Sequence, residues 1–416
     1  MHFSTKNYDS KKTSQYFYKA GRILAIGGLP GYVKWCESGY TRPVYKHIQS
    51  FLTVCVVSFV VMEVGAFFTQ TNLTERQQTD LLVLGFCHPI LMTYPFILTY
   101  HRERIRNLLY RLCVTLKKVY NDVEVERRMT RSATLYSISI VLNIYSALIS
   151  YGYEEMLHVI RTGEYLFVKN SSVIVEEDGT FMPVITAWPD VKDESNLAHI
   201  SRIACYLIWW VCMTRICAAF YLIIIITGCL CFQYTNLQSY FYSLNDIFEQ
   251  AGETDRENAE HKYEEAFKVG IQLHAETLWC TRQCQVICSI VYSLQIVLNV
   301  ATFSVLMLQM TNSERTLAST IKTVVSCAAL LCTTGMSMWN AGNVTIEATH
   351  LPTAMYCSGW HLCRGRSSLR VRKLLVVAMI QAQRHVVIHG FGIMEISYRA
   401  YVTMVKTSYS VFSLLY

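Results

Sequence analysis

Seven long apolar runs constrain the fold more than any other feature of the sequence. The hydrocarbon core of a bilayer is about 30 Å thick, so a helix needs roughly 20 predominantly apolar residues to cross it. These runs predict an all-α polytopic membrane protein with seven transmembrane helices. They lie at His47–Phe68, Leu81–Tyr100, Ala133–Gly152, His199–Tyr234, Cys284–Met310, Leu317–Asn340 and Phe391–Tyr416.

The composition agrees with a membrane location. Of the 416 residues, 52% are hydrophobic and only 16% are charged, which departs from the balance of a soluble globular protein. Most of the 16 cysteines lie inside apolar runs, where a thiol behaves as a small hydrophobe, so we expect free thiols. The net charge of +7 comes from basic runs beside apolar segments, which suits a cytoplasmic membrane face better than a nucleic-acid partner.

The distribution of basic residues orients the chain in the bilayer. Residues 1–46 carry eight Lys or Arg without the pattern of a signal peptide. Residues 101–132 hold nine Lys or Arg, whereas residues 153–198 hold three among nine acids. Because Lys and Arg accumulate in cytoplasmic loops, we expect the N-terminus inside and the C-terminus outside. The sequons at Asn72 and Asn170 then fall in external loops, where glycosylation is expected.

The fourth run, His199–Tyr234, is long enough to leave two interpretations open. Its 36 residues would span about 54 Å as a helix, nearly twice the bilayer core, so two spans are conceivable. One long helix that continues into the cytosol is favoured, because no proline or polar turn interrupts the run. After a break at residues 251–255, apolar positions at helical spacing lead back to the fifth run, which predicts a cytosolic helical hairpin.

Six successive parts follow from this topology. They are a cytoplasmic segment at 1–46, transmembrane helices 1–4 at 47–234 with an extracellular loop at about 153–198, a cytosolic helical hairpin at 235–283, transmembrane helices 5–6 at 284–340, a cytosolic helical segment at 341–390, and transmembrane helix 7 at 391–416.

Enzyme chemistry is not expected, and neither a metal nor a cofactor is predicted. The sequence has no hydrolase elbow, phosphate loop or HExxH motif. Ionisable residues inside the apolar runs are more informative, because each is costly in lipid and tends to face protein or water. Glu63 and Arg215 suit partners within the bundle, Lys322 is close enough to the outer surface to snorkel, and Glu395 and Arg399 fit an i, i+4 pair in the last helix.

Aromatic and small polar residues near the predicted outer side are candidates for a small-molecule pocket. Walls of this kind, apolar with few polar groups, bind small ligands, although they also form ordinary cores. The predicted external loop between spans three and four is a candidate lid. The candidate lining residues are Leu84, Cys87, His88 and Leu91 in span two, Tyr145, Ile149 and Tyr153 in span three, and Tyr206 and Trp210 in span four.

The last third of the chain resembles the insect odorant receptors. The order and spacing of the matching residues follow the closing region of that family over about 75 residues, and the rest of the chain is similar in topology and length. One departure is Arg384-His385, where many members have a proline. The matching residues are Gly342-Asn343, Leu351-Pro352, Ala354, Tyr356, Trp360, Arg372-Lys373-Leu374, Met379, Lys406-Thr407-Ser408-Tyr409-Ser410 and Leu414.

This resemblance implies a function. Members of the family are subunits of tetrameric cation channels in the plasma membrane of olfactory sensory neurons, where a tuning receptor assembles with an odorant co-receptor and binds a small volatile ligand. The last helix of each subunit lines the pore, and the cytosolic helical ends form the main subunit contact. The resemblance places a hydrophobic gate at Phe412 and Tyr416, with Leu415 and Ser408 on about the same face.

Other classes remain open at this point. A metabotropic seven-helix chemoreceptor has its N-terminus outside, contrary to the charge distribution. A gustatory receptor of the same superfamily usually closes with Thr-Tyr followed by Gln-Phe, whereas this chain has Ser408-Tyr409 and ends in Leu-Leu-Tyr. A transporter is expected to have two similar halves, and the sequence shows no such repeat.

Overall fold

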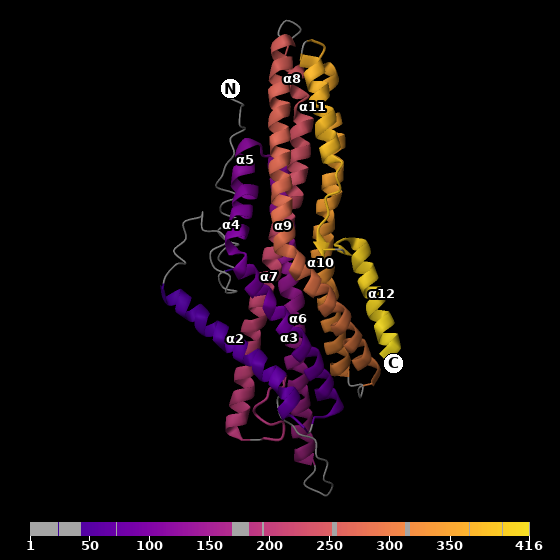
Figure 1. The fold of residues 1–416 in the computed structure, drawn as a ribbon. Coiled ribbons are helices and arrows are strands. Elements are labelled where there is room, and N and C mark those ends of the chain that lie inside the picture. Colours follow the sequence, from indigo (N-terminus) through magenta and orange to yellow (C-terminus); the bar gives the residue numbers. More distant parts are fainter. Residues whose placement is uncertain are drawn as a thin grey trace.

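The computed structural model describes residues 24, 43–71, 73–168, 183–193, 195–251, 256–312, 317–365, 367–392 and 394–415. Long helices dominate this part of the chain and pack side by side into one elongated bundle (Figure 1). The major helices are α2 (Pro43–Thr69), α3 (Glu75–Tyr100), α6 (Val123–Val168), α7 (Asn196–Ser243), α9 (Arg256–Asn312), α10 (Leu317–Tyr356), α11 (Ser367–Ala382) and α12 (Tyr398–Leu415).

The expected membrane protein is confirmed by the length and apolarity of these helices. Within the described residues, six helices are long and apolar enough to cross a bilayer, and they begin at residues 47, 77, 123, 196, 256 and 317. The 18-residue helix α12 corresponds to the seventh predicted span. The apolar runs of the sequence therefore each correspond to one helix.

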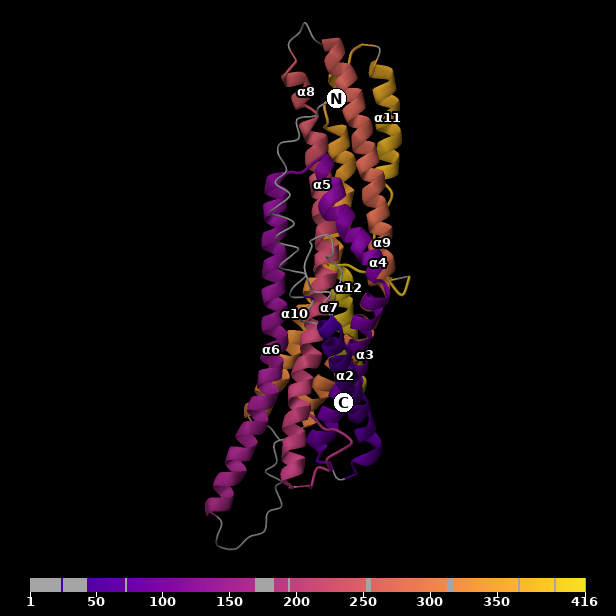
Figure 2. The same cartoon turned by 90° about the vertical axis from the view of Figure 1, so that its left-hand side faces the viewer.

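Helix α7 is a single helix of 48 residues, so the interpretation of the fourth run as one continuous helix is confirmed. Together with α8 (Asp246–Glu249), the first half of α9, the end of α10 and α11, it extends well beyond the level at which α12 begins (Figures 1 and 2). Glu264 of α9 pairs with Arg370 of α11 at 2.8 Å, which fastens the extended part of the bundle.

The segment between α3 and α6, expected as a basic cytoplasmic loop, contains helices of its own. They are α4 (Arg102–Tyr110), a π-helical turn (Arg111–Thr115) and α5 (Leu116–Val119). The apolar side chains of Ile105, Leu108 and Leu112 are buried among the helices, while the arginines remain at the surface. Six of the nine basic residues that orient the chain therefore lie in this amphipathic helical segment, and Arg127, Arg128 and Arg131 lie at the start of α6.

Helix α6 is longer than predicted at both ends. It begins at Val123 and continues to Val168, so it takes up the first part of the segment that the sequence assigned to an external loop. Of the candidate lid, residues 183–193 are described. They lie against the end of α2, where the amide nitrogen of Gln70 donates to the carbonyl of Thr186 at 2.9 Å and the backbone N–H of Ala187 donates to Met62.

The seventh helix begins later than the sequence predicted, because a short hairpin precedes it. Strand β1 (His389–Gly390) pairs antiparallel with β2 (Met394–Glu395), and Gly392 has a φ of 70°, a region that favours glycine. The Gln285 side chain of α9 holds the hairpin through both polar groups of the His389 backbone. Glu395 therefore lies in a strand, and the expected helical i, i+4 pair with Arg399 is wrong.

Candidate functional site

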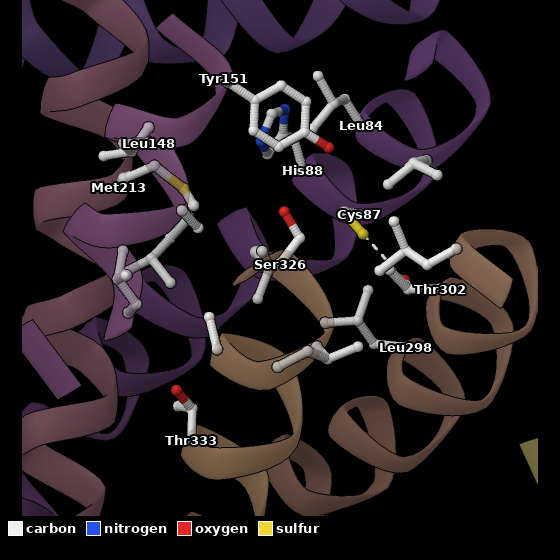
Figure 3. A pocket seen from close by; sticks show the side chains of 18 of the residues that line it. Leu84, Cys87, His88, Leu148, Tyr151, Met213, Leu298, Thr302, Ser326 and Thr333 are labelled. Atoms are coloured by element: carbon white, nitrogen blue, oxygen red, sulfur yellow. Dashed lines mark hydrogen bonds between the residues drawn. The ribbon is translucent and has the colours of Figure 1, made fainter. Parts of the chain in front are cut away.

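A cavity of about 130 Å³ lies between α3, α6, α7, α9 and α10 (Figure 3). Its lining is mostly apolar, and a few polar side chains contributed by several of these helices interrupt it. This is the usual construction of a site for a small apolar ligand. The lining residues include Leu84, Cys87, His88 and Leu91 of α3, Ile144, Leu148 and Tyr151 of α6, Trp209, Met213 and Phe220 of α7, Gln295, Leu298 and Thr302 of α9, and Ser326 and Thr333 of α10.

His88 connects the cavity wall to α2 and α7. Its Nδ1 lies 2.7 Å from a carboxylate oxygen of Glu63, and its Nε2 accepts the indole N–H of Trp209 at 2.8 Å. A nitrogen that accepts the indole proton carries none of its own, so the proton of the neutral ring lies on Nδ1 and is donated to Glu63. All three side chains are buried, and the imidazole ring is held in one orientation.

A buried ion network lies at the predicted outer end of the cavity. Lys322 of α10 is 1% exposed and lies 2.8 Å from both Asp80 of α3 and Glu154 of α6. Its ammonium group also lies 4.8 Å from the ring centre of Tyr151, which lines the cavity, and Gln309 of α9 donates to Asp80 at 2.9 Å. Four helices are therefore joined at this end by charge-assisted contacts.

Neutral hydrogen bonds join α3, α9 and α10 at the other end of the cavity. The Tyr94 hydroxyl donates to the side-chain oxygen of Gln295 at 2.9 Å, and the Gln295 amide donates to Thr334 at 2.8 Å. Thr334 in turn donates to Asn299 at 2.9 Å. The ion network therefore lies at one end of the cavity, and this amide–hydroxyl network lies at the other.

Helix α12 packs against α9 and α10 and exposes a polar stripe. The hydroxyl of Ser304 in α9 donates to the backbone carbonyl of Ser408 at 3.0 Å, which holds the helix in place. Five exposed polar residues follow each other at intervals of three or four, so they share one helix face. They are Arg399, Thr403, Lys406, Ser410 and Ser413.

A sequence model of the family described as 7tm Odorant receptor matches residues 79–409, from α3 into α12. The chain belongs to the 7tm odorant receptor family. The family resemblance found in the closing region is therefore confirmed over most of the receptor. No curated protein matches the receptor in sequence.

Solved structures support the same fold for this receptor. The insect olfactory receptor OR5 from Machilis hrabei in complex with eugenol superposes with a TM-score of 0.75 at 11% identity, over 98% of this chain and 99% of that chain. The same protein described without eugenol gives 0.74 at 11% identity, with the same coverage. At this identity the likeness shows the fold, and it extends over the whole length of both proteins.

Four of the nine candidate pocket residues of the receptor line the cavity, and all four belong to α3. They are Leu84, Cys87, His88 and Leu91. Their shared face follows from helical spacing, which places residues three, four and seven apart on one side. Ligand contact by these residues stays a prediction.

The five candidates on α6 and α7 lie outside the cavity wall. Tyr145 donates to or accepts from Thr214 at 2.6 Å and stacks near Trp210, while the Tyr206 hydroxyl donates to the carbonyl of Leu148 at 3.3 Å. These three side chains fill the seam between α6 and α7. The other two, Ile149 and Tyr153, are 57% and 50% exposed.

On α6 and α7, the aromatic residues that line the cavity lie one or two positions away in the sequence from the predicted ones. Tyr151 of α6 and Trp209 of α7 face the cavity and contact each other edge to face at 5.5 Å. Lys322 was also missed as a site residue, because its nearness to the surface suggested snorkelling. The predicted topology places Asp80 of α3 and Glu154 of α6 near the outer membrane surface, as it does Lys322. Acidic residues at the same depth in the membrane indicate that the lysine has ionic partners.

Three of the four candidate gate residues, Ser408, Phe412 and Leu415, belong to α12. Ser408 is buried against α9, and Phe412 is partly buried beside Tyr409, with ring centres 6.1 Å apart. Leu415 is the last residue of the helix. Tyr416 lies outside the described residues, as do the predicted glycosylation sites Asn72 and Asn170.

Proposed function

We propose that this receptor binds a small, volatile, apolar molecule in the cavity between α3, α6, α7, α9 and α10. Binding opens a non-selective cation channel that the receptor forms with odorant co-receptor subunits in the plasma membrane of olfactory sensory neurons. The apolar cavity is the observation that carries the first part of this proposal, because it offers contact area and very few polar groups.

Helix α12 supports the channel part of the proposal. A polar stripe on a membrane helix is costly when it faces lipid, and it requires water or protein. The stripe that contains Thr403, Lys406 and Ser410 meets this requirement if α12 faces a central water-filled pore. The gate rests on the family resemblance instead: Phe412 lies on another face of α12 than the polar stripe, and the resemblance assigns to Phe412, Leu415 and Tyr416 an apolar constriction that blocks ions by dewetting.

Helix α9 contacts both the cavity and α12, so it supplies a route that couples ligand binding to the proposed pore. Thr302 and Leu298 of α9 line the cavity, and Ser304 on the same helix holds the Ser408 backbone of α12. A ligand that shifts the outer part of α9 also changes the support of the pore helix. In this proposal, α9 is the physical connection between the bound ligand and the pore helix.

The proposal is tested by recording from cells that express the receptor with and without an odorant co-receptor. We expect currents evoked by members of a broad odorant panel only when both subunits are present. A cell-surface receptor that gives no current with any panel member contradicts the proposal. An epitope tag at Met1 that antibodies reach on intact cells supports a metabotropic receptor instead.

For the gate, we expect Phe412→Ala to raise the basal current of the assembled channel, because a smaller apolar side chain widens a dewetted constriction. The measurement is whole-cell current without odorant, normalised to surface expression. Leu414→Ala is the control, since this apolar neighbour is 86% exposed and, two residues from Phe412, lies on the other side of the helix. Unchanged basal current and ion selectivity in Phe412→Ala remove this residue from the pore.

A further inference from the structure

The polar atoms in the cavity wall are mostly engaged by the protein itself. Both ring nitrogens of His88 are occupied, one by Glu63 and the other by the indole N–H of Trp209. The side-chain amide of Gln295 accepts from Tyr94 and donates to Thr334. A ligand therefore meets these groups with their hydrogen-bonding capacity largely used.

The same holds for the thiol and hydroxyl where α3 meets α9. Cys87 Sγ and Thr302 Oγ1 lie 2.9 Å apart and form a hydrogen bond with each other (Figure 3). The charged groups nearby are also engaged, because Lys322 is held between Asp80 and Glu154. A charged ligand would lose its hydration in this cavity without meeting a free counter-charge, so the cavity favours neutral molecules.

Two hydroxyl groups on α10 differ from the rest of the wall. Thr333 Oγ1 and Ser326 Oγ are buried atoms with no hydrogen-bond partner within 3.5 Å among the described residues. Both side chains line the cavity, seven residues apart on the same helix face (Figure 3). Ser326 is partly exposed and has the Tyr151 phenol beside it, whereas Thr333 is 5% exposed.

A buried hydroxyl without a partner costs free energy, so such a group is usually satisfied by water or by a ligand. The Thr333 hydroxyl lies in the wall of a cavity whose other surfaces are apolar. A ligand oxygen that accepts its proton removes this cost, and a hydrocarbon of the same shape does not. A site of this kind discriminates between the two molecules.

We propose that the cavity selects small neutral molecules that combine an apolar body with one hydrogen-bond-accepting oxygen, such as a ketone, and that the Thr333 hydroxyl donates to this oxygen. This inference rests on the proposed function, because it assigns a ligand class to the same cavity. It adds a specificity-determining residue and excludes plain hydrocarbons and charged compounds as preferred ligands.

The test uses purified receptor in lipid nanodiscs and the fluorescent apolar probe 1-aminoanthracene. Displacement of the probe is measured for two pairs of molecules that differ only by C=O in place of C=CH₂: acetophenone with α-methylstyrene, and 2-heptanone with 2-methyl-1-heptene. The affinity ratio within each pair is compared between the wild-type receptor and Thr333→Val. Partition into the lipid cancels in this comparison, because the same two molecules are used with both proteins.

We expect the ketone-to-alkene affinity ratio to be higher in the wild-type receptor than in Thr333→Val by a factor on the order of ten, the value of about one hydrogen bond. Affinity for the alkenes stays within about twofold, because valine keeps the Cβ branching and the number of side-chain heavy atoms of threonine and removes only the hydroxyl. Thr323→Val is the matched control: Thr323 is a buried threonine of the same helix, and its hydroxyl donates to the carbonyl of Ser319 outside the cavity.

The outcomes separate this inference from the function on which it rests. Saturable probe binding with equal ratios in the wild-type receptor and Thr333→Val overturns the inference and leaves the cavity as a ligand site. An equal fall of the ketone-to-alkene affinity ratio in Thr323→Val also overturns the inference. The fall would then come from a general change in the structure of α10 and not from the Thr333 hydroxyl. No saturable probe binding by the wild-type receptor overturns both the inference and the proposed binding site.

Discussion

At the scale of single residues, the cavity wall is organised by hydrogen bonds that fix polar side chains in place. His88 illustrates this, because its ring is held from both sides by groups on different helices, Glu63 on α2 and Trp209 on α7. An imidazole that is free to rotate would offer a ligand either a donor or an acceptor. The fixed ring offers mainly its edge, which keeps that part of the wall apolar.

We expect His88→Phe to destabilise the receptor by about 3 kcal/mol, because it leaves the Glu63 carboxylate buried without its partner. Trp209→Phe should cost about 1–2 kcal/mol, since it removes one neutral hydrogen bond and some packing. Thermal unfolding of both variants in the same detergent measures the difference. Equal losses in the two variants would show that Glu63 does not depend on His88.

Lys322 is expected to stabilise the outer end of the bundle only as long as both carboxylates are present. Lys322→Met leaves the buried Glu154 and the partly buried Asp80 without their shared cation, which costs about 3 kcal/mol. Adding Glu154→Gln to this variant removes one of the two unpaired negative charges and restores part of the stability. The interaction free energy between the two substitutions is expected to be about 1–3 kcal/mol. A double-mutant cycle measured by thermal unfolding checks this, and strictly additive losses would contradict the network.

At the scale of helices, the sequence predicts well where a membrane helix lies and roughly how long it is. It predicts poorly which face of that helix is turned toward the cavity. Apolar runs are sufficient to locate the membrane helices, because lipid requires them. Helix α7 is buried on nearly every side through its middle, so its sequence has no polar face that indicates which residues meet the cavity. Trp209 and Trp210 are adjacent aromatic residues, and hydropathy alone does not distinguish the one that lines the cavity.

The starts of helices are predictable only where the sequence carries a local signal. Thr74 and Gln77 form a capping box that begins α3, a pattern visible in the sequence. The start of α12 is set instead by the hairpin around Gly390 and Gly392, which α9 holds through the side chain of Gln285. Because that contact joins residues about one hundred positions apart, local patterns do not reveal it.

The junction between α5 and α6 gives a pH-dependent prediction. Burial acts to raise the pKa of Asp122, but hydrogen bonds from Ser239 and from the backbone N–H groups of Glu124 and Val125 lower it below its usual value of 3.8. The resulting stability is therefore present above about pH 4 and is lost as the pH falls through the lowered pKa of the folded state.

We expect Asp122→Ala to reduce the stability of the receptor by about 1 kcal/mol at neutral pH, because it removes a helix cap. The difference between wild type and this variant should shrink below about pH 4. Thermal unfolding at several pH values measures it, and Asp122→Asn is a control that keeps the cap without titrating. A difference that is constant with pH contradicts the role of the carboxylate.

At the scale of the whole molecule, the extended end of the bundle carries an exposed apolar surface. One face of α11 packs on α9 and α10 through Val371, Leu375 and Ala378. The opposite face exposes apolar side chains at helical spacing, in a part of the receptor predicted to lie in the cytosol. These side chains, the α11 surface, are Leu369, Val376, Val377 and Ile380.

The α11 surface fits a contact between subunits, so we expect Val377→Glu to weaken assembly with the co-receptor by at least tenfold while the single chain folds normally. Val377 is 67% exposed, and a charge there is solvated in the monomer but buried in an interface. Co-purification with the co-receptor measures assembly. Val119→Glu, on the exposed end of α5, is the control, and equal recovery of both variants contradicts the contact.

Helix α9 has a consequence for how receptors of this kind can diversify. This single helix of 57 residues, about 85 Å long, lines the cavity, supports α12 and pairs with α11. Under the proposed function, substitutions along this helix reach ligand binding, conduction and assembly, so selection is expected to act on all three at once. Helix α6 lines the same cavity but packs mainly on α7 and α10. New odour preferences are therefore expected to arise through substitutions in α6, while α9 stays nearly constant between related receptors.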